Sequence, residues 1–302
     1  MAGSCYMTSG RAGAPEPGPP LPPVRGVRHR FVDVGEVRIH IAETGTGPPI
    51  VLLHGEPQHW YAWRHVIPRI ADRYRVICPD LRGMGWSDAP ASGYDKERMA
   101  TDMLTMLDQL DLDEVRLVGH DYGGIVGFLM CLRTPERFVR FLALSTYHPW
   151  LTARGILANA PREWYQGITA APGLGPAVVR YCPAFWRFLM RAGMRDKSIW
   201  APGEVEHYAE HVRHPARAEA TSQLARSLIS DLRAARRYER VTLRVPTRML
   251  LGSRDFAISR HLIRRWEPHA ENLSFELVPD GSHWMLNEHP DLVVREIDQF
   301  IR

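Results

Sequence analysis

Lysine is almost missing from this chain. Only two of its 38 basic residues are lysines, Lys96 and Lys197, and the arginines that make up the rest are balanced by 34 acidic residues. The net charge is therefore only +4, no basic block occurs, and many arginines lie beside an acid. This pattern gives no support to a nucleic-acid partner.

Long hydrophobic runs are absent as well. The longest apolar stretches have the length of a β-strand, so no membrane-spanning helix is expected. Residues 1–25 are rich in proline, glycine and alanine and contain no hydrophobic segment after a basic start. We interpret them as a disordered extension and not as a signal peptide, which makes a cytoplasmic location the expectation.

Cysteine is scarce, and its spacing suggests no pairing. The four cysteines are far apart in the chain and form no Cys-x-x-Cys motif: Cys5, Cys78, Cys131 and Cys182. This distribution predicts buried free thiols in a reducing compartment.

The chain does contain a regular alternation of strand and helix patterns. Strand patterns occur at residues 31–34, 37–43, 50–53, 74–78, 115–118, 141–144, 247–251 and 273–278. Helical patterns occur at residues 62–71, 96–110, 125–134, 259–267 and 290–301. Such alternation is typical of an α/β fold, in which helices cover both faces of a mostly parallel sheet.

The alternation stops after Ser145. Residues 148–237 contain helical and proline-punctuated segments rich in aromatic residues, but no convincing strand pattern. We therefore divide the chain into an α/β core, residues 26–147 and 238–302, and an inserted helical cap, residues 148–237. A cap placed over the carboxyl ends of the strands would enclose a pocket.

The most informative segment is residues 118–124, with the sequence Val-Gly-His-Asp-Tyr-Gly-Gly. It follows a strand pattern and precedes a helical one, so a sharp turn should hold its central side chain at the carboxyl edge of the sheet. Serine usually stands there and performs acyl transfer, but here the residue is Asp121. A carboxylate instead attacks an electrophilic carbon and forms an alkyl ester, which water must then cleave.

Cleavage of such an ester needs a general base and an acid that orients it. His283 lies after the last strand pattern and before the final helix pattern, and Asp255 follows the strand pattern of residues 247–251. The chain order nucleophile, acid, histidine is that of α/β-hydrolases. We expect His283 to activate water and Asp255 to accept its other ring N–H.

The site also needs hydrogen-bond donors for an oxyanion and walls for a substrate. The backbone N–H groups of Glu56 and Tyr122 follow two different strand patterns and are the expected donors. Trp60, Tyr61 and Trp284 are neighbours of these positions in the sequence and are expected to line an apolar pocket.

Each of these residues also has a purely structural explanation. Asp121 and Asp255 could cap helices, His283 could be a solvated loop histidine, and Glu56 could be a surface side chain. Their placement at the ends of different strands, in the order that the chemistry uses, favours the catalytic interpretation.

With these motifs in place, the chain resembles the α/β-hydrolase family from about residue 27 to its end. The similarity is strongest at residues 54–57 (His-Gly-Glu-Pro), 60–64, 80–88 and 119–124. Within the family it resembles the branch of epoxide hydrolases and haloalkane dehalogenases, which use an aspartate nucleophile. The resemblance implies an eight-stranded sheet, a helical cap and hydrolysis without a cofactor.

Epoxide hydrolases resemble this chain most. They carry a cap tyrosine in a Tyr-Gln pair followed by Pro-Gly, and residues 165–166 and 172–173 match that spacing. The resemblance implies that Tyr165 donates to the alkoxide formed when the ring opens. A tyrosine that only packs within the cap is the alternative.

The chain departs from this pattern at the second cap tyrosine, which normally stands just before an arginine. Ala225 stands there instead. Tyr208 or Tyr181 could replace the lost donor, but their spacing selects neither.

The expected function is therefore the opening of a small apolar epoxide to a diol, through an ester on Asp121. A haloalkane dehalogenase is the alternative, although Tyr122 stands where those enzymes usually have tryptophan and haloacetate dehalogenases have arginine. A hydrolase fold that has become a binding module is a further alternative, but the retained Asp121, Asp255 and His283 argue against it. Neither the natural substrate nor its stereochemistry follows from the sequence, and a homodimer is left open.

One histidine group could suggest a metal. His207, His211 and His214 have the spacing of one helix face. Because the surrounding segment is strongly polar, we expect an exposed cap helix and no metal.

Overall fold

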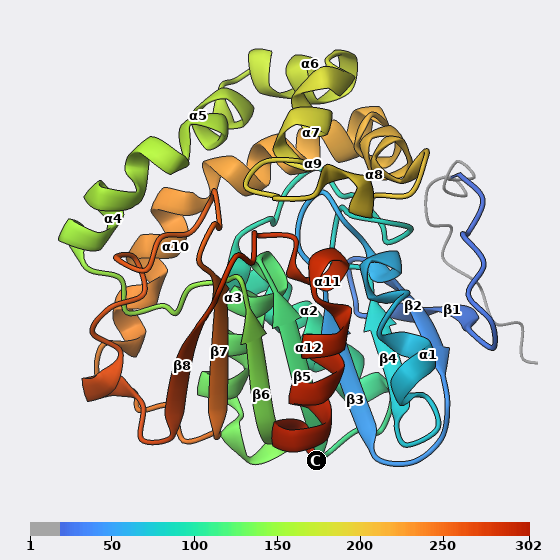
Figure 1. Ribbon diagram of the computed structural model, residues 1–302, viewed down its shortest axis with the longest axis vertical. Helices are drawn as coiled ribbons and strands as arrows, with labels where there is room; N and C mark the ends of the chain where they lie inside the picture. The colour runs from blue at the N-terminus through green and yellow to red at the C-terminus, as the bar shows by residue number, and fades with distance from the viewer. Residues whose placement is uncertain (1–18) are drawn as a thin grey trace, which may run out of the picture.

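An eight-stranded sheet forms the centre of the structure, a computed structural model that describes residues 19–302 (Figure 1). Its strands are β1 (Arg28–Asp33), β2 (Arg38–Thr44), β3 (Pro49–Leu53), β4 (Arg75–Pro79), β5 (Val115–His120), β6 (Phe138–Leu144), β7 (Thr247–Gly252) and β8 (Leu273–Val278). Their order across the sheet is β1-β2-β4-β3-β5-β6-β7-β8. The expected α/β fold with an eight-stranded, mostly parallel sheet is confirmed.

The parallel part of the sheet brings distant segments together. β1 pairs antiparallel with β2, and β2 with β4, whereas β3 to β8 run parallel. The central strands β3 and β5 are almost entirely buried, as their continuous apolar sequences predict. Because the carboxyl ends of parallel strands share one edge, the loops after β3, β5, β7 and β8 converge there.

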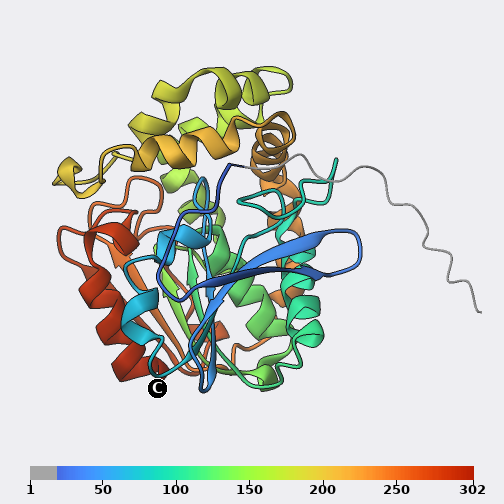
Figure 2. The same ribbon diagram turned by 90° about the vertical axis from the view of Figure 1, so that its right-hand side faces the viewer.

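Helices cover both faces of the sheet (Figures 1 and 2). On one face lie α1 (Ile67–Ile70), α11 (Met285–Glu288) and α12 (Pro290–Glu296), the last continued by a π-helical turn, Ile297–Ile301. On the other lie α2 (Lys96–Gln109) and α3 (Tyr122–Arg133). Their apolar side chains and those of the strands form the two main hydrophobic clusters, so burial on both faces holds the sheet rigid.

Seven α-helices occupy the chain between β6 and β7, and we call this part of the chain the cap. They are α4 (Ala153–Asn159), α5 (Trp164–Ala170), α6 (Leu174–Tyr181), α7 (Pro183–Leu189), α8 (Glu204–Val212), α9 (Pro215–Arg226) and α10 (Leu228–Ala235). Figure 1 shows α4 to α9 above the carboxyl ends of the parallel strands. The cap therefore lies over the edge at which the loops converge.

The prediction of a helix at residues 259–267 is wrong. The chain there forms turns and only a short 3₁₀-helix at Glu267–His269. Arg265 has φ +69°, which interrupts any regular helix. Leu262 and Ile263 are buried instead by tertiary packing, which is why apolar spacing imitated a helix.

The N-terminal extension is described only in part. Residues 1–18, most of the segment expected to be disordered, lie outside the described residues, as does Cys5. The carbonyl of Pro19 accepts a hydrogen bond from Trp86 Nε1 at 2.8 Å.

The cysteines and the membrane expectation can be compared with the described residues. Cys78 and Cys131 are buried free thiols, as expected, whereas Cys182 is free but exposed at the end of α6. Between residues 19 and 302, no helix is long and apolar enough to cross a membrane.

Candidate active site

Asp121 occupies a strained turn between β5 and α3. Its φ of 52° and ψ of −123° lie outside the regions that most residues adopt, and such strain is typical of a nucleophile elbow. The turn can form because a Cβ at Gly123 would lie 2.5 Å from the carbonyl oxygens of Leu53 and His54, an approach only glycine permits. Thr146 Oγ1 donates to the Asp121 carbonyl at 2.8 Å, which secures the turn.

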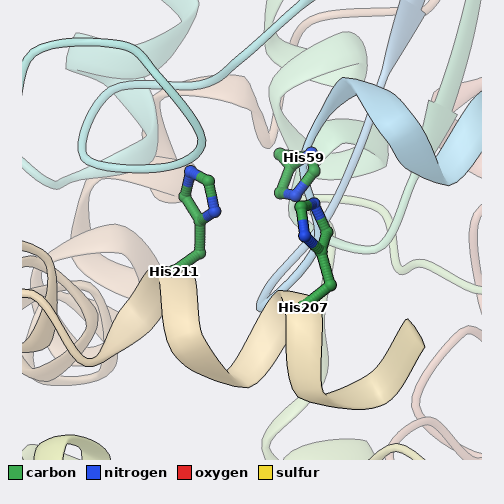
Figure 3. Close-up of side chains that lie close together, drawn as sticks. All are labelled: His59, His207 and His211. Carbon is green, nitrogen blue, oxygen red and sulfur yellow. The ribbon is translucent and has the colours of Figure 1, made fainter. Parts of the chain in front are cut away.

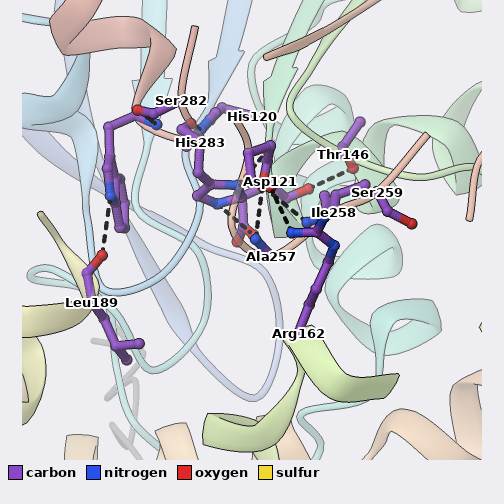
Figure 4. Close-up of polar contacts among 12 residues, drawn as sticks. His120, Asp121, Thr146, Arg162, Leu189, Ala257, Ile258, Ser259, Ser282 and His283 are labelled. Atoms are coloured by element: carbon purple, nitrogen blue, oxygen red, sulfur yellow. Dashed lines mark hydrogen bonds and ion pairs between the residues drawn. The ribbon is translucent and has the colours of Figure 1, made fainter. Parts of the chain in front are cut away.

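His283 lies between two carboxylates. Its Nε2 is 3.2 Å from Asp121 Oδ2, and its Nδ1 is 3.0 Å from Asp255 Oδ2. Asp255 Oδ1 also accepts the backbone N–H groups of Ala257 and Ile258, each at 2.9 Å (Figure 4). The three residues predicted from three separate strand ends therefore form one chain of polar contacts, and Asp255 is held rigidly behind the imidazole.

Both predicted backbone donors point at the Asp121 carboxylate. The Glu56 N–H lies 3.2 Å from Asp121 Oδ1, and the Tyr122 N–H donates to the same carboxylate. His54 shapes the turn before Glu56: its Nδ1–H donates to the Gly55 carbonyl at 2.9 Å, and its Nε2 accepts from the Leu81 N–H at 3.0 Å. One carboxylate oxygen is thus turned to backbone donors and the other to His283.

The ionised forms of Asp121 and His283 stabilise each other. Burial alone would raise the pKa of Asp121, but the hydrogen bond from His283, its charge and the Tyr122 N–H lower that pKa below its ordinary value. Burial alone would lower the pKa of His283, but the Asp255 and Asp121 carboxylates raise it to about 10. At neutral pH the resting site therefore holds an imidazolium between two carboxylates.

A further histidine supports the loop that carries His283. His120 is buried, and its Nε2 lies 2.8 Å from the His283 carbonyl, to which it donates as a neutral imidazole. Burial and the charge of His283 lower the pKa of His120 to about 4, which keeps this ring uncharged. His120, the residue before Asp121, thus fixes the position of His283.

Asp121 faces two adjoining chambers beneath the cap. The larger has a volume of about 170 Å³ and the smaller about 30 Å³. Four residues line both chambers: Asp121, Tyr122, Tyr165 and Gln166. His283 lines the smaller one, and the walls of the larger one are mainly aliphatic: Leu151, Ile156, Leu228, Leu232, Ile258 and Leu262. A small apolar molecule in the larger chamber would reach Asp121, and water in the smaller one would reach His283.

Tyr165 projects from α5 into both chambers, as its predicted role requires. Its ring packs against Phe256, with ring centroids 5.8 Å apart. The adjacent Gln166 donates from Nε2 to the Tyr122 hydroxyl at 2.9 Å and joins the cap to the elbow.

Two of the three residues expected to line the pocket do not do so. Trp60 is fully buried: its backbone N–H donates to Asp80 Oδ1 at 2.7 Å and its ring packs against His29. Tyr61 turns toward the guanidinium of Arg64, which lies 5.0 Å from its ring centroid. Only Trp284 lines a chamber, the smaller one.

The two tyrosines considered as a second donor lie elsewhere. Tyr208 is fully buried against the core, where its hydroxyl accepts from Arg64 Nη1 at 3.4 Å. Tyr181 is 66% exposed at the end of α6. Ala225 is buried in α9 and offers no polar side chain, so the described residues supply no replacement from these three positions.

Sequence reasoning missed six polar side chains of the chambers. Tyr147, Asn159, Glu163 and Lys96 line the larger chamber, and Thr169 and Trp186 line the smaller one. No local motif marks them, because they reach the site from the loop after β6, from the cap and from the start of α2. The scarcity of lysine was the only signal that could have drawn attention to Lys96.

The Lys96 ammonium is already paired. It forms an ion pair with Asp231 at 2.8 Å and donates to Ser227 Oγ at 2.9 Å and to the Leu224 carbonyl at 3.2 Å. It also lies 4.6 Å from the centroid of the Tyr122 ring. With its donors engaged, Lys96 ties α2 to the cap and leaves little positive charge for a ligand.

Two acidic side chains beside Asp121 hold their protons more firmly than usual. Burial, with the charge of Asp121, raises the pKa of Glu163 to about 7, and Asn159 Nδ2 donates to it at 3.0 Å. Burial also raises the pKa of Glu56 to about 8, so its side chain is neutral at pH 7. Glu56 is therefore not the surface side chain of the alternative interpretation, and its neutrality avoids repulsion with Asp121.

Comparisons with known proteins agree with this architecture. The sequence profile described as alpha/beta hydrolase fold matches residues 48–290. The chain is 31% identical over 290 residues to the AB hydrolase superfamily protein YfhM of Bacillus subtilis (strain 168), covering 92% of this chain and 99% of that protein. It is 28% identical over 294 residues to a fluoroacetate dehalogenase of Burkholderia sp, covering 91% and 94%. A solved structure of the epoxide hydrolase CorEH superimposes with a TM-score of 0.78 at 28% identity, covering 91% of this chain and 98% of that one.

Proposed function

Since this chain belongs to the alpha/beta hydrolase fold family, we propose that it hydrolyses a small apolar epoxide to a diol through a covalent ester on Asp121. One observation carries the proposal: the Asp121 carboxylate faces the chambers with Oδ1 3.2 Å from the Glu56 N–H and Oδ2 3.2 Å from His283 Nε2. This arrangement suits an attacking carboxylate whose other oxygen stays with backbone donors.

In the first step, Asp121 Oδ2 attacks a ring carbon of the epoxide. The carbon–oxygen bond of the ring breaks, and its electron pair moves to the ring oxygen, which takes the hydroxyl proton of Tyr165. The products are a neutral ester on Asp121 and a Tyr165 phenolate.

Formation of the ester changes the charge of the base. His283 loses one of the two carboxylates that hold its pKa at about 10, so that pKa falls. The proton that His283 releases restores the Tyr165 hydroxyl, and the neutral imidazole can then accept a proton from water. Asp255 keeps the ring in place throughout.

In the second step, water in the smaller chamber attacks the ester carbonyl of Asp121. His283 takes one proton of the water, and the N–H groups of Glu56 and Tyr122 hold the resulting oxyanion, each typically worth about 3–4 kcal/mol. The tetrahedral intermediate then breaks its bond to the diol oxygen. That oxygen takes the proton of the hydroxyl group that water added to the carbonyl carbon. Asp121 is again a carboxylate, His283 is again protonated, and one water has been consumed.

The charges favour a neutral substrate over an anionic haloacid. Two carboxyl groups, Asp121 and Glu163, line the larger chamber, whereas the single cation there among the described residues, Lys96, is paired with Asp231. A substrate carboxylate would meet repulsion without a free positive partner.

A haloalkane remains a second candidate because of Trp186. Its indole Nε1–H is buried, has no partner among the described residues, and belongs to a side chain that lines the smaller chamber. An indole N–H can donate to a departing halide, although it cannot supply the proton that an opened epoxide needs.

We expect Tyr165→Phe to slow epoxide opening by roughly 10²-fold, because the ring oxygen loses its proton donor. Release of halide from a chloroalkane with the same carbon skeleton should change little, since a halide leaves without a proton. Diol and halide formation are measured under single-turnover conditions for wild type and variant, together with fluoroacetate as a haloacid.

The matched control is Tyr181→Phe, which removes an exposed cap tyrosine and should behave like wild type. If wild type releases halide but forms no diol, the haloalkane candidate replaces the epoxide. Equal epoxide rates in Tyr165→Phe and wild type would return Tyr165 to a packing role.

Glu163 should make epoxide opening depend on pH near neutrality. With its pKa raised to about 7, it is protonated and able to donate below pH 7, and it carries a second negative charge beside Asp121 above that pH. The rate of ester formation should therefore fall as pH rises through about 7. Glu163→Gln keeps a neutral donor and should abolish that fall; pre-steady-state rates from pH 5.5 to 8.5 measure it.

Glu239→Gln, which changes an exposed glutamate, is the control and should keep the wild-type pH profile. An unchanged fall near pH 7 in Glu163→Gln would assign the titration to another group.

A further inference from the structure

Three histidines meet where the cap contacts the core. His207 and His211 lie one turn apart on α8, and His59 directly precedes the 3₁₀-helix Trp60–Trp63 of the core. Figure 3 shows both cap histidines on the side of α8 that faces His59. One nitrogen from each ring lies within 4.8 Å of the other two. None of the three lines the chambers beside Asp121.

This arrangement corrects the expectation from the sequence. The polar character of α8 suggested an exposed helix, but His211 is only 2% exposed and His207 is half-buried. His214 does not belong to the group. Its place is taken by His59, which lies 148 positions before His207 in the chain and which no local spacing could have added.

Each of the three rings has at least one buried nitrogen with no hydrogen-bond partner among the described residues. Nε2 of His59, Nε2 of His207 and both ring nitrogens of His211 are buried without a partner among the described residues. His59 is 0% exposed. A buried polar atom without a partner costs free energy, and one nitrogen from each of the three rings lies close enough to the other two for all three to share one partner.

The rings are in the protonation state that a metal ion requires. Burial among other histidines lowers the pKa of His59 well below its ordinary value, and burial with the charge of Arg217 lowers the pKa of His211 to about 3; burial also lowers the pKa of His207. All three are neutral imidazoles at pH 7, each with a lone pair on one nitrogen.

The charges around the group are balanced. Arg64 faces His207 but is paired with Glu204, and Arg217 faces His211 but donates from Nε to the Gly85 carbonyl at 2.8 Å. The buried carboxylate of Asp80 faces His211, and Glu210 faces His207. The carboxylates offset the two guanidinium groups, so the position can accept a cation.

We propose that His59, His207 and His211 bind one divalent transition-metal ion of the class that prefers imidazole, such as Zn²⁺ or Ni²⁺. The three nitrogens would be protein ligands, and the half-buried side of His207 would leave a position for water. The proposal is independent of the chemistry at Asp121.

Binding requires only a small contraction. Tetrahedral Zn²⁺ with bonds of about 2.0–2.1 Å places its ligand nitrogens roughly 3.4 Å apart, so nitrogens that now lie within 4.8 Å need to approach by at most about 1.4 Å through side-chain rotation. Ligation through Nε2 of His59 puts its proton on Nδ1, where the Tyr61 N–H now makes a long contact of 3.4 Å. The weak hydrogen bond from the Tyr61 N–H to Nδ1 is then lost, and a bond between the metal and Nε2 is gained.

The surroundings would hold the ligands in place. The Trp86 ring packs edge-on against His211, with centroids 4.3 Å apart, and the Tyr208 ring lies 4.9 Å from that of His59. Such an apolar shell limits the motion of the imidazoles and the access of water. Because His59 belongs to the core and the others to α8, the ion would fasten the cap to the core.

To test the proposal, metal content and thermal unfolding are measured for the full chain without a histidine tag. After removal of metal with EDTA and dialysis against Zn²⁺ or Ni²⁺, wild type should retain about one ion per chain and its Tm should rise. His207→Ala removes a partly exposed ligand and should weaken binding by more than about 100-fold and abolish the rise in Tm. His211→Gln, a second variant of similar size, should do the same.

His261→Ala is the control, because His261 is an exposed histidine outside the group. It should bind metal like wild type. Tetrahedral Co²⁺ absorption in wild type and its loss in His207→Ala give a readout of the ligand set. Retention of no more metal by wild type than by His207→Ala would overturn the proposal, as would loss of binding in His261→Ala alone.

Discussion

Replacement of His283 by glutamine should leave the protein alkylated after a single encounter with its substrate. Glutamine can still bond to Asp255, and the Asp121 carboxylate and Tyr165 are unchanged, so the ester can form. No base remains to activate water, and turnover should fall by about 10³-fold or more. Intact-protein mass spectrometry should show a gain equal to the mass of the epoxide, and peptide mapping should place it on Asp121.

The trapped ester is a large effect because His283 has no substitute close to Asp121. His120, which directly precedes Asp121, is committed to the His283 carbonyl, and its pKa of about 4 makes it a weak base. The matched variant is His261→Gln, which changes an exposed histidine and should neither accumulate an ester nor lose turnover. Turnover at the wild-type rate by His283→Gln would refute the assignment of the base.

The candidate site residues that the structure brings together share one property: each follows a strand within a few positions. Asp121, Asp255 and His283 come after β5, β7 and β8, and the parallel sheet converts those three local positions into one place. The topology of the sheet brings the three strand ends together. A local motif at each strand end was therefore enough to predict that these residues meet.

The pocket walls could not be predicted in this way. Glu163, Lys96 and Trp186 reach the chambers because the cap folds over the sheet, and that packing has no local signature. Trp60 and Tyr61 failed for the opposite reason. They are close in sequence to Glu56, but the Trp60 N–H donates to Asp80 and the Tyr61 ring lies against Arg64, so neither side chain lines the chambers.

The same distinction explains the histidine group. Helical spacing identified His207 and His211 as neighbours, but the contribution of His59 depends on how α8 docks on the core. Hydrophobic spacing at residues 259–267 likewise imitated a helix because tertiary contacts, not helical periodicity, bury those side chains. In each case the error arises where non-local packing overrides a local pattern.

Replacement of Asp121 by asparagine should abolish ester formation and lower turnover by roughly 10⁴-fold, because the amide is a far weaker nucleophile. Asparagine tolerates the positive φ of 52° better than alanine does, so the elbow should keep its shape. The matched control is Asp111→Asn: Asp111 has a similar φ of 53°, is exposed and lies outside the chambers, and its replacement should leave turnover unchanged.

Isotope labelling of the wild-type protein distinguishes attack by Asp121 on the epoxide from direct attack by water. In one turnover in H₂¹⁸O, the oxygen added to the diol should be the unlabelled Oδ2 of Asp121, because His283-activated water attacks the ester carbonyl and remains in the carboxylate. The peptide that contains Asp121 should gain one ¹⁸O, and later turnovers should deliver that label to the diol. A diol fully labelled in the first turnover, with an unlabelled Asp121 peptide, would mean that water opens the ring directly and that Asp121 acts only through its charge.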